Sequence, residues 1–349
     1  MKIGYVANSP DLMHPADRRR FAHFARREDV YFEEFNHYIE YDVVIFTIVA
    51  NFTEILSYKI RFPRVYLIFD YCDDLLSDSK IKQLIRPIYE GVKWKTFLNL
   101  RDYNALVIEM LSAANIIICG SREQQKGLLQ YNTSVVVIPD FVVTESLLSK
   151  NSFELVDPPR ASVLWEGLSG GLSRIAVDLF KLLGSVDEEI LLNVVTDPKT
   201  FLVGDRYIAT DTKKYLQKLA RRFGIEVRFW SWSKENLNSA IECSDFGIIL
   251  IPKGDKTMQN KPENKLVLLS SFGLPVLVSS TPSYKRYLES AGGQELYALA
   301  TNPNSRNLQK FCSQPGLRSF TGECLRSYAL KEYAEEEIIK KWKALLNGF

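Results

Sequence analysis

The chain has 349 residues, 46% of them hydrophobic and 25% charged, and 44 basic against 42 acidic side chains leave a net charge of +2. This composition is that of a globular protein, and the length predicts about two domains. The charge balance argues against a dedicated nucleic-acid binder, whose domain carries a strong basic excess. No stretch approaches the roughly 18 unbroken apolar residues of a transmembrane helix.

The cysteines and histidines are sparse. Five cysteines are scattered without a C-x-x-C pair, and only three histidines are present. Neither a zinc site nor a disulfide framework is indicated, and the opening "MKIGYVANSP" lacks the apolar core of a secretory signal. We therefore expect a cytoplasmic protein that needs no metal.

Short apolar runs alternate with helical patterns over the first part of the chain. The runs are nearly continuous, which is typical of strands covered on both faces of a parallel sheet. The alternation predicts a doubly wound α/β domain over residues 1–150. The predicted strands are 2–7, 30–35, 42–50, 64–70, 115–121 and 134–140, and the predicted helices are 16–28, 52–62, 100–114 and 122–132.

A polar stretch at 146–161, ending in two prolines and an Arg-Ala pair, is the predicted linker. The α/β alternation then restarts and predicts a second Rossmann-like domain over residues 160–325. The last segment, 330–349, has apolar residues at helical spacing and predicts an amphipathic helix. The predicted strands of the second domain are 162–167, 190–197, 225–232, 245–252 and 274–280.

The segment "KPENKLVLLSSFGLPVLVSS" (261–280) places Lys265 at the start of an apolar helix. Pro262 suits a helix entry, and the N–H groups of a first helical turn form an anion site. A cation at a helix start opposes the macrodipole unless an anion lies nearby. The pattern predicts a bound phosphate. The alternative is a lysine that points into solvent.

This segment, Pro-x-Asn-Lys-Leu followed by an apolar helix and Gly-Leu-Pro-Val, resembles the donor-binding domain of GT-B glycosyltransferases, and family 4 most closely (glycosyl transferases group 1). The resemblance implies two tandem Rossmann-like domains facing a cleft, with the C-terminal helix crossing back to the N-terminal domain. Other stretches resemble the family in the same order, namely 111–129, 135–142, 162–171, 225–252 and the final helix.

The resemblance implies a metal-independent sugar transferase. The donor, a nucleotide sugar, would be a substrate held by the domain at 160–325, and no cofactor is expected. The acceptor, a glycan, a lipid-linked or another hydroxyl compound, would lie on the domain formed by 1–150 and 330–349. A helix N-terminus and basic residues would stabilise the diphosphate leaving group.

Residue by residue, the family pattern places Asn264 and Lys265 against the diphosphate. The glycine turn after the first strand of the second domain would cradle a phosphate. A plain strand-to-helix turn is the alternative for Gly170 and Gly171, and a place in the core is the alternative for Trp232. The full set of expected donor contacts is Gly167, Gly170, Gly171, Arg174, Trp232, Glu263, Asn264 and Lys265.

The sequence departs from the family at two places. Many members carry two glutamates where this chain has Asn260 and Leu268, and Glu263 is the nearest carboxylate. The Gly-Gly loop common near the N-terminus is replaced by "NSPDLMHPADRRRF" (8–21). Whether the sugar configuration is retained or inverted is therefore open.

That N-terminal loop follows the first strand and supplies the candidate catalytic bases Asp11, His14 and Asp17. The arginines at 18–20 would hold an anionic acceptor or the leaving diphosphate. The alternative is that Asp17 favours a helix start while the arginines are solvated. Asp70, at a strand end, fits either catalysis or hydrogen bonding between domains.

Two other functions remain open on the sequence. One is a sugar transferase that acts on modified DNA bases, which the arginines at 18–20 leave possible. The other is a non-catalytic GT-B-like binding or scaffold protein, which the missing glutamates favour. The sequence also leaves peripheral membrane association open.

Overall fold

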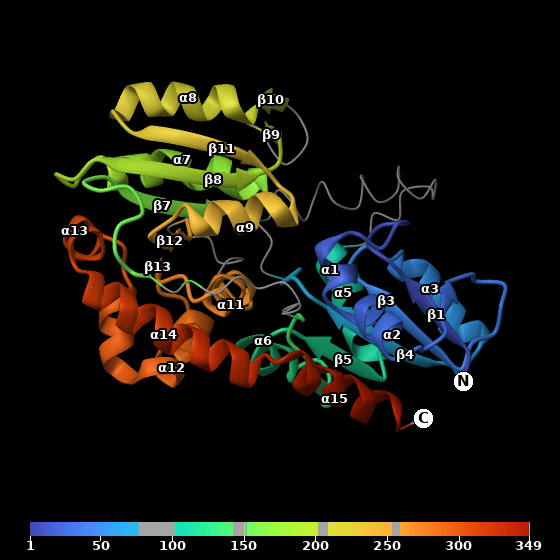
Figure 1. Ribbon diagram of the computed structural model, residues 1–349. Coiled ribbons are helices and arrows are strands. Elements are labelled where there is room, and N and C mark those ends of the chain that lie inside the picture. The colour runs from blue at the N-terminus through green and yellow to red at the C-terminus, as the bar shows by residue number, and fades with distance from the viewer. Residues whose placement is uncertain (77–101, 142–149, 151, 202–208, 253–258, 349) are drawn as a thin grey trace. The chain divides into compact units, whose positions relative to one another are not determined.

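The computed structural model describes residues 1–76, 102–141, 150, 152–201, 209–252 and 259–348 (Figure 1). The predicted linker at 146–161 lies partly outside these residues. The chain forms two compact units. Unit 1 comprises Met1–Phe141, Lys256–Pro262 and Glu335–Phe349, and unit 2 comprises Val142–Asp255 and Glu263–Ala334.

Unit 1 contains a six-stranded parallel sheet in the order β2-β1-β3-β4-β5-β6. Every residue of β3 is buried, as its continuous apolar run predicts. The strand predicted at 30–35 is reduced to a two-residue edge strand with exposed or half-buried side chains. The strands are β1 (Ile3–Val6), β2 (Glu33–Glu34), β3 (Val43–Thr47), β4 (Tyr66–Tyr71), β5 (Ile116–Cys119) and β6 (Val135–Val137).

Two layers of helices cover this sheet. Helices α2 and α15 bury their apolar faces on one side, and α3, α5 and α6 on the other. The helix predicted at 16–28 is broken in two, because the backbone leaves the helical conformation at Arg20. The helices are α1 (Pro15–Arg18), α2 (Phe21–Arg27), α3 (Phe52–Arg61), α5 (Tyr103–Ala113), α6 (Arg122–Leu128) and α15 (Glu335–Leu346).

The last helix of the chain belongs to unit 1. Trp342 of α15 lies between Phe21 and Phe24 of α2, with ring centroids 5.7 Å away in each case. The predicted return of the C-terminal helix to the N-terminal domain is thereby confirmed (Figure 1).

Unit 2 has a five-stranded parallel sheet in the order β11-β8-β7-β12-β13. The order runs outward in one direction from β7 through β8 to β11, and in the other from β12 to β13. Such a reversal is the topological switch point of a Rossmann-like sheet. The strands are β7 (Ala161–Glu166), β8 (Ile190–Thr196), β11 (Glu226–Ser231), β12 (Phe246–Ile249) and β13 (Val276–Val278), with a small antiparallel pair β9 (Lys199–Phe201) and β10 (Ala209–Asp211).

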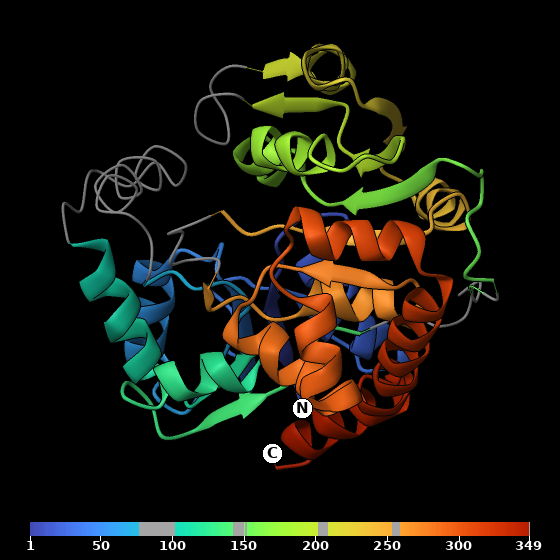
Figure 2. The ribbon, with the colours of Figure 1, turned by 90° about the vertical axis from the view of Figure 1, so that its left-hand side faces the viewer.

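Helices cover both faces of the unit 2 sheet, and two separate hydrophobic clusters result. Helix α8 lies at the outside of the unit in both ribbon views (Figure 1 and Figure 2). One face carries α7 (Ser169–Leu183), α8 (Thr212–Phe223) and α13 (Ser305–Ser313), and the other carries α9 (Lys234–Glu242), α11 (Asn264–Ser271), α12 (Pro282–Ala300) and α14 (Pro315–Glu332).

Two kinds of feature are absent from the described residues. No helix among them combines the length and the apolar character required to cross a bilayer. Nor do the described side chains include a group of three or more His, Cys, Asp or Glu residues placed to hold a metal ion.

Candidate functional site

The switch point of unit 2 lies at the carboxyl ends of β7 and β12, the position where open α/β sheets bind ligands. From β7 the chain passes through Gly167 into α7, and α11 is the first described helix of unit 2 after β12. The two connections are nearly a hundred residues apart in sequence, yet Lys265 of α11 touches Gly167. The structure therefore brings together two of the predicted donor residues.

The ammonium group of Lys265 is held against the end of β7. Its Nζ donates a hydrogen bond of 2.8 Å to the carbonyl oxygen of Glu166 and lies 4.7 Å from the ring centroid of Trp165. A Cβ at position 167 would lie 1.9 Å from this Nζ, so only glycine leaves room for it. Lys265 is half-buried, and the solvent-directed alternative does not describe it.

Trp232 extends the same group of residues across the sheet edge. It directly follows β11, and its Nε1 donates to Oε1 of Glu166 at 3.2 Å. The indole is half-buried, so it is neither a core residue nor a fully exposed one. Glu166 was missed by the sequence analysis, although a carboxylate that ends an apolar strand just before a glycine turn is a recognisable signal.

Gly170 and Gly171 lie in the first turn of α7. The start of this helix already faces a carboxylate, because Ser169 N donates to Oδ2 of Asp197 at 3.0 Å. Gly171 N donates to the Leu168 carbonyl at 2.9 Å, and a Cβ on Gly171 would meet no atom within 4 Å. A phosphate cradled here would share the helix start with Asp197. Arg174 is exposed, one turn further along α7.

Glu263 is the residue before α11 and is only 2% exposed. Its Oε1 forms an ion pair with Arg286 of α12 and accepts a hydrogen bond from the Tyr333 hydroxyl. Burial raises the pKa of Glu263, and the neighbouring Arg286 opposes that rise. The carboxylate thus fixes the start of α11. It thereby sets the position of the half-buried Asn264 and of Lys265.

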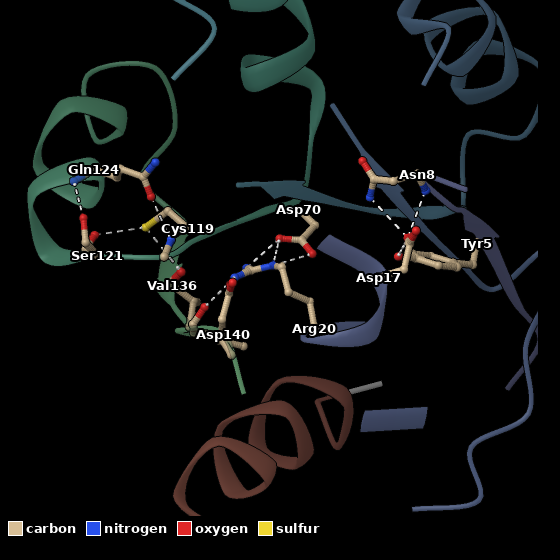
Figure 3. A network of polar contacts seen from close by, with 12 residues as sticks. Tyr5, Asn8, Asp17, Arg20, Asp70, Cys119, Ser121, Gln124, Val136 and Asp140 are labelled. Atoms are coloured by element: carbon tan, nitrogen blue, oxygen red, sulfur yellow. Dashed lines mark hydrogen bonds and ion pairs between the residues drawn. The ribbon is translucent and has the colours of Figure 1, made fainter. Parts of the chain in front are cut away.

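Asp17 is buried in unit 1 and holds the loop after β1 (Figure 3). Its Oδ1 accepts hydrogen bonds from the Tyr5 hydroxyl at 2.7 Å and from Asn8 N at 2.9 Å, and Oδ2 accepts from Ser9 N at 3.0 Å. Burial, reinforced by this carboxylate, raises the pKa of Tyr5. In this arrangement Asp17 positions the loop.

The other two candidate bases are exposed. Nδ1 of His14 accepts a hydrogen bond of 3.2 Å from Ala16 N and caps α1. A neutral imidazole bonded in this way carries its proton on Nε2, so that nitrogen donates instead of accepting. Asp11 accepts a 3.0 Å hydrogen bond from Met13 N, which lowers its pKa. A carboxylate with a lowered pKa is a weaker base.

Arg20 fits neither sequence reading of the arginines, because it is buried in a structural ion pair (Figure 3). Its Nε lies 2.8 Å from both carboxylate oxygens of Asp70, and its Nη1 lies 2.8 Å from Asp140. The same Nη1 donates to the carbonyl of Ile138 at 3.1 Å. Arg20 therefore joins the ends of β4 and β6 to the start of α2.

Asn260, at one of the family's glutamate positions, lies in the part of unit 1 that precedes α11. Its Nδ2 donates to Oδ2 of Asp74 at 2.8 Å, and the neighbouring Lys261 pairs with Asp73 at 3.2 Å. These two aspartates thus receive partners from a distant stretch of the chain.

The fold of this chain is similar to that of several proteins of known structure. No protein-family model matches the sequence, and no curated protein is significantly similar to it. Among solved structures, TarM matches with a TM-score of 0.58 at 13% identity, over 87% of this chain and 54% of its own. HepE from Anabaena, in complex with UDP and glucose, matches with a TM-score of 0.60 at 11% sequence identity, over 100% of this chain and 99% of its own. AviGT4, a glycosyltransferase involved in avilamycin A biosynthesis, matches with a TM-score of 0.54 at 10% sequence identity, over 100% of this chain and 99% of its own.

The chain spans about half the length of TarM and almost all of HepE and AviGT4. At such low identities the likeness establishes the architecture. The chain has the GT-B fold of two Rossmann-like units, as the sequence predicted. The closer resemblance to family 4 stays a prediction.

Proposed function

We propose that this protein is a glycosyltransferase that moves a sugar from a nucleoside diphosphate sugar to an acceptor hydroxyl. The observation that carries the proposal is the contact between Lys265 and Gly167 at the switch point of unit 2. Structures of the same fold that hold UDP support it, namely HepE and a TarM variant from S. aureus.

The diphosphate would bind at the start of α11. Transfer breaks the bond between the anomeric carbon and the diphosphate, and negative charge builds up on the departing oxygen. A diphosphate oxygen beside the Lys265 ammonium, which the Glu166 carbonyl and the Trp165 ring hold in place, would accept a charge-assisted hydrogen bond from it. Because the ammonium is already in place, it would stabilise the leaving group without reorganisation, and no metal ion is required.

The nucleoside would lie along the edge formed by Trp232 and Glu166. The half-buried indole offers a surface for the base. The Glu166 carboxylate, in place of the glutamate absent at Leu268, would accept hydrogen bonds from the ribose hydroxyls. The acceptor would bind to unit 1 beside the loop after β1, where Asp17 holds the backbone and Asp11 and His14 are exposed.

The test is Lys265→Ala, assayed with a panel of nucleotide sugars for transfer and hydrolysis and by calorimetry for UDP binding. We expect turnover to fall at least about tenfold, since one preorganised donor contributes ~10²–10³ in comparable enzymes. The melting temperature should change little, because the side chain is only half-buried. Lys285→Ala is the matched control, an exposed lysine of unit 2 that pairs with Glu289. Undiminished turnover in Lys265→Ala would remove this lysine from the mechanism.

A non-catalytic binding protein is the second candidate, favoured by the structural engagement of Asp17 and His14. It predicts that UDP binds and that binding requires Lys265. It also predicts no turnover with any donor, even when glycan and lipid-linked acceptors are supplied. Measurable transfer in the wild-type protein would exclude this candidate.

A further inference from the structure

Helix α8 (Thr212–Phe223, "TKKYLQKLARRF") has an unusually uniform surface. Six of its side chains are exposed, and all but one of these are basic. No acidic residue lies within the helix. The exposed residues are Lys213, Lys214, Gln217, Lys218, Arg221 and Arg222.

The opposite half of α8 is fixed in the core of unit 2. Leu216 is fully buried and Leu219 is 6% exposed, and both belong to the cluster that α7 forms with the sheet. The helix cannot turn its cations inward without exposing these leucines. The basic face is therefore a permanent outer surface of the unit (Figure 1 and Figure 2).

Helix stability does not account for this charge pattern. Arg221 and Arg222 lie in the last turn, where the macrodipole favours cations, but Lys213 and Lys214 lie in the first turn, where it opposes them. Lys214, Lys218 and Arg222 follow one another at intervals of four residues, a spacing at which like charges repel. Asp211, the acidic residue at this helix start, caps the backbone through Lys214 N at 2.8 Å.

The basic face also differs from the rest of the chain. Several exposed lysines elsewhere are paired, such as Lys340 with Glu337 and Lys343 with Glu28. Within the part of the chain that the structure describes, the five cations of α8 form no ion pair. The whole chain has a net charge of +2, so the chain outside α8 carries 2 − 5 = −3. Positive charge is concentrated on α8, and the rest of the chain is slightly acidic.

We propose that the basic face of α8 binds the surface of an anionic lipid bilayer. Clusters of four to eight Lys and Arg residues on an amphipathic helix have this affinity. The helix is about 18 Å long, and Lys214, Lys218 and Arg221 point to nearly the same side of it, so they can approach a plane of phosphate groups together. Lys213 and Arg222 flank them on either side, and their long side chains can reach the same plane. No apolar side chain of α8 is exposed, and so the attachment is electrostatic, reversible and without insertion.

Nucleic acid fits this face less well. Duplex readers place a helix or strand in a groove, whereas half of α8 is buried in its own unit. Binders of single strands stack bases on exposed aromatic rings, and the two aromatic residues of α8, Tyr215 and Phe223, are half-buried. The basic face of α8 does not include Lys265, and its binding to lipid does not depend on the proposed transferase activity.

The experiment measures binding of the full-length protein to vesicles of phosphatidylcholine with about 30% phosphatidylglycerol, and to pure phosphatidylcholine, at about 0.1 M salt. We expect binding to the anionic vesicles alone, and its loss at about 0.5 M salt. Replacing all five cations of α8 by Gln should weaken binding about fivefold per side chain, roughly three-thousandfold in total. The control replaces five exposed cations elsewhere by Gln and should bind nearly as the wild type does. These are Lys285, Arg306, Lys331, Lys340 and Lys341.

Three results would overturn the proposal. Equal binding to neutral and anionic vesicles, or none to either, excludes an electrostatic lipid surface. Equal weakening by the α8 and control sets shows that net charge matters and the helix does not. Tighter binding to duplex DNA or to an anionic polysaccharide than to the anionic vesicles, at the same salt, assigns the face to another polyanion. Thermal unfolding of each variant verifies that it is folded.

Discussion

Gly167 determines where the cation of the candidate site lies. The ammonium of Lys265 occupies the space that a side chain at position 167 would fill, and Gly167 has a φ of +151°, which favours glycine. The sequence predicted a role for each residue separately. Their contact requires two connections on neighbouring strands of the folded sheet, and nothing in the local pattern at either position reveals it.

We expect Gly167→Ala to reproduce the functional effect of Lys265→Ala, because the added methyl group displaces the ammonium. UDP affinity and turnover should both fall at least about tenfold. The matched control is Gly316→Ala in the first turn of α14, where a Cβ meets open space. It should stabilise the protein by about 0.5–1 kcal/mol and leave UDP affinity unchanged. Calorimetry and thermal unfolding of both variants check this, and a Gly167→Ala variant with full affinity would contradict it.

Loops at the carboxyl edge of the unit 1 sheet are held by one buried arginine. Arg20 interrupts the helix predicted at 16–28 and bonds to Asp70 near the end of β4 and to Asp140 after β6. The sequence pattern of 16–28 is compatible with one helix. The break occurs because a buried guanidinium must be paired, and its carboxylate partner Asp70 is 50 residues away.

Arg20→Met should destabilise the protein by about 3–5 kcal/mol, because it leaves Asp70 buried without its counter-charge. Burial raises the pKa of Asp70 and Arg20 opposes that rise, so the pKa should climb further in the variant. A raised carboxyl pKa means that the folded state binds the proton more tightly. The loss of stability relative to the wild type is therefore complete above the pKa of Asp70 in the variant, and it becomes smaller as the pH falls below that pKa.

Denaturant unfolding of Arg20→Met and of the wild type, at about pH 5 and about pH 8, measures the difference in their free energies of unfolding. We expect this difference to be smaller at the lower pH. Arg26→Met, an exposed arginine of α2, is the control and should change stability by less than about 0.5 kcal/mol. Equal deficits of Arg20→Met at both pH values would show that Asp70 does not titrate in the variant.

On the scale of the whole molecule, unit 1 is assembled from both ends of the chain. Helix α15 is the last helix, yet Ile338 and Trp342 lie in one cluster with Ile3 and Phe21. Its amphipathic pattern predicted a helix with one apolar face. The GT-B resemblance predicted which unit that face would cover.

Ending the chain after Ala334 should therefore destabilise the unit that lies first in sequence. Loss of α15 exposes Phe21 and Phe24 of α2, and removal of the buried Trp342 alone is expected to cost about 3–5 kcal/mol. Hydrogen exchange should show reduced protection in β1 and β3 and nearly unchanged protection in β7 and β8. Reduced protection in unit 2 alone would contradict the assignment of α15 to unit 1.

The sequence by itself determined the class of the fold, the order of its elements and the lysine at the start of α11. These features depend on apolar periodicity and on helix-end chemistry, which act over a few neighbouring residues. Only the tertiary structure decided what the charged side chains do. Asp17 and Glu263 became buried positioning groups, Arg20 an ion-pair partner and Glu166 a member of the site. Their partners come from distant segments, and the cost of burying a charge depends on whether such a partner arrives.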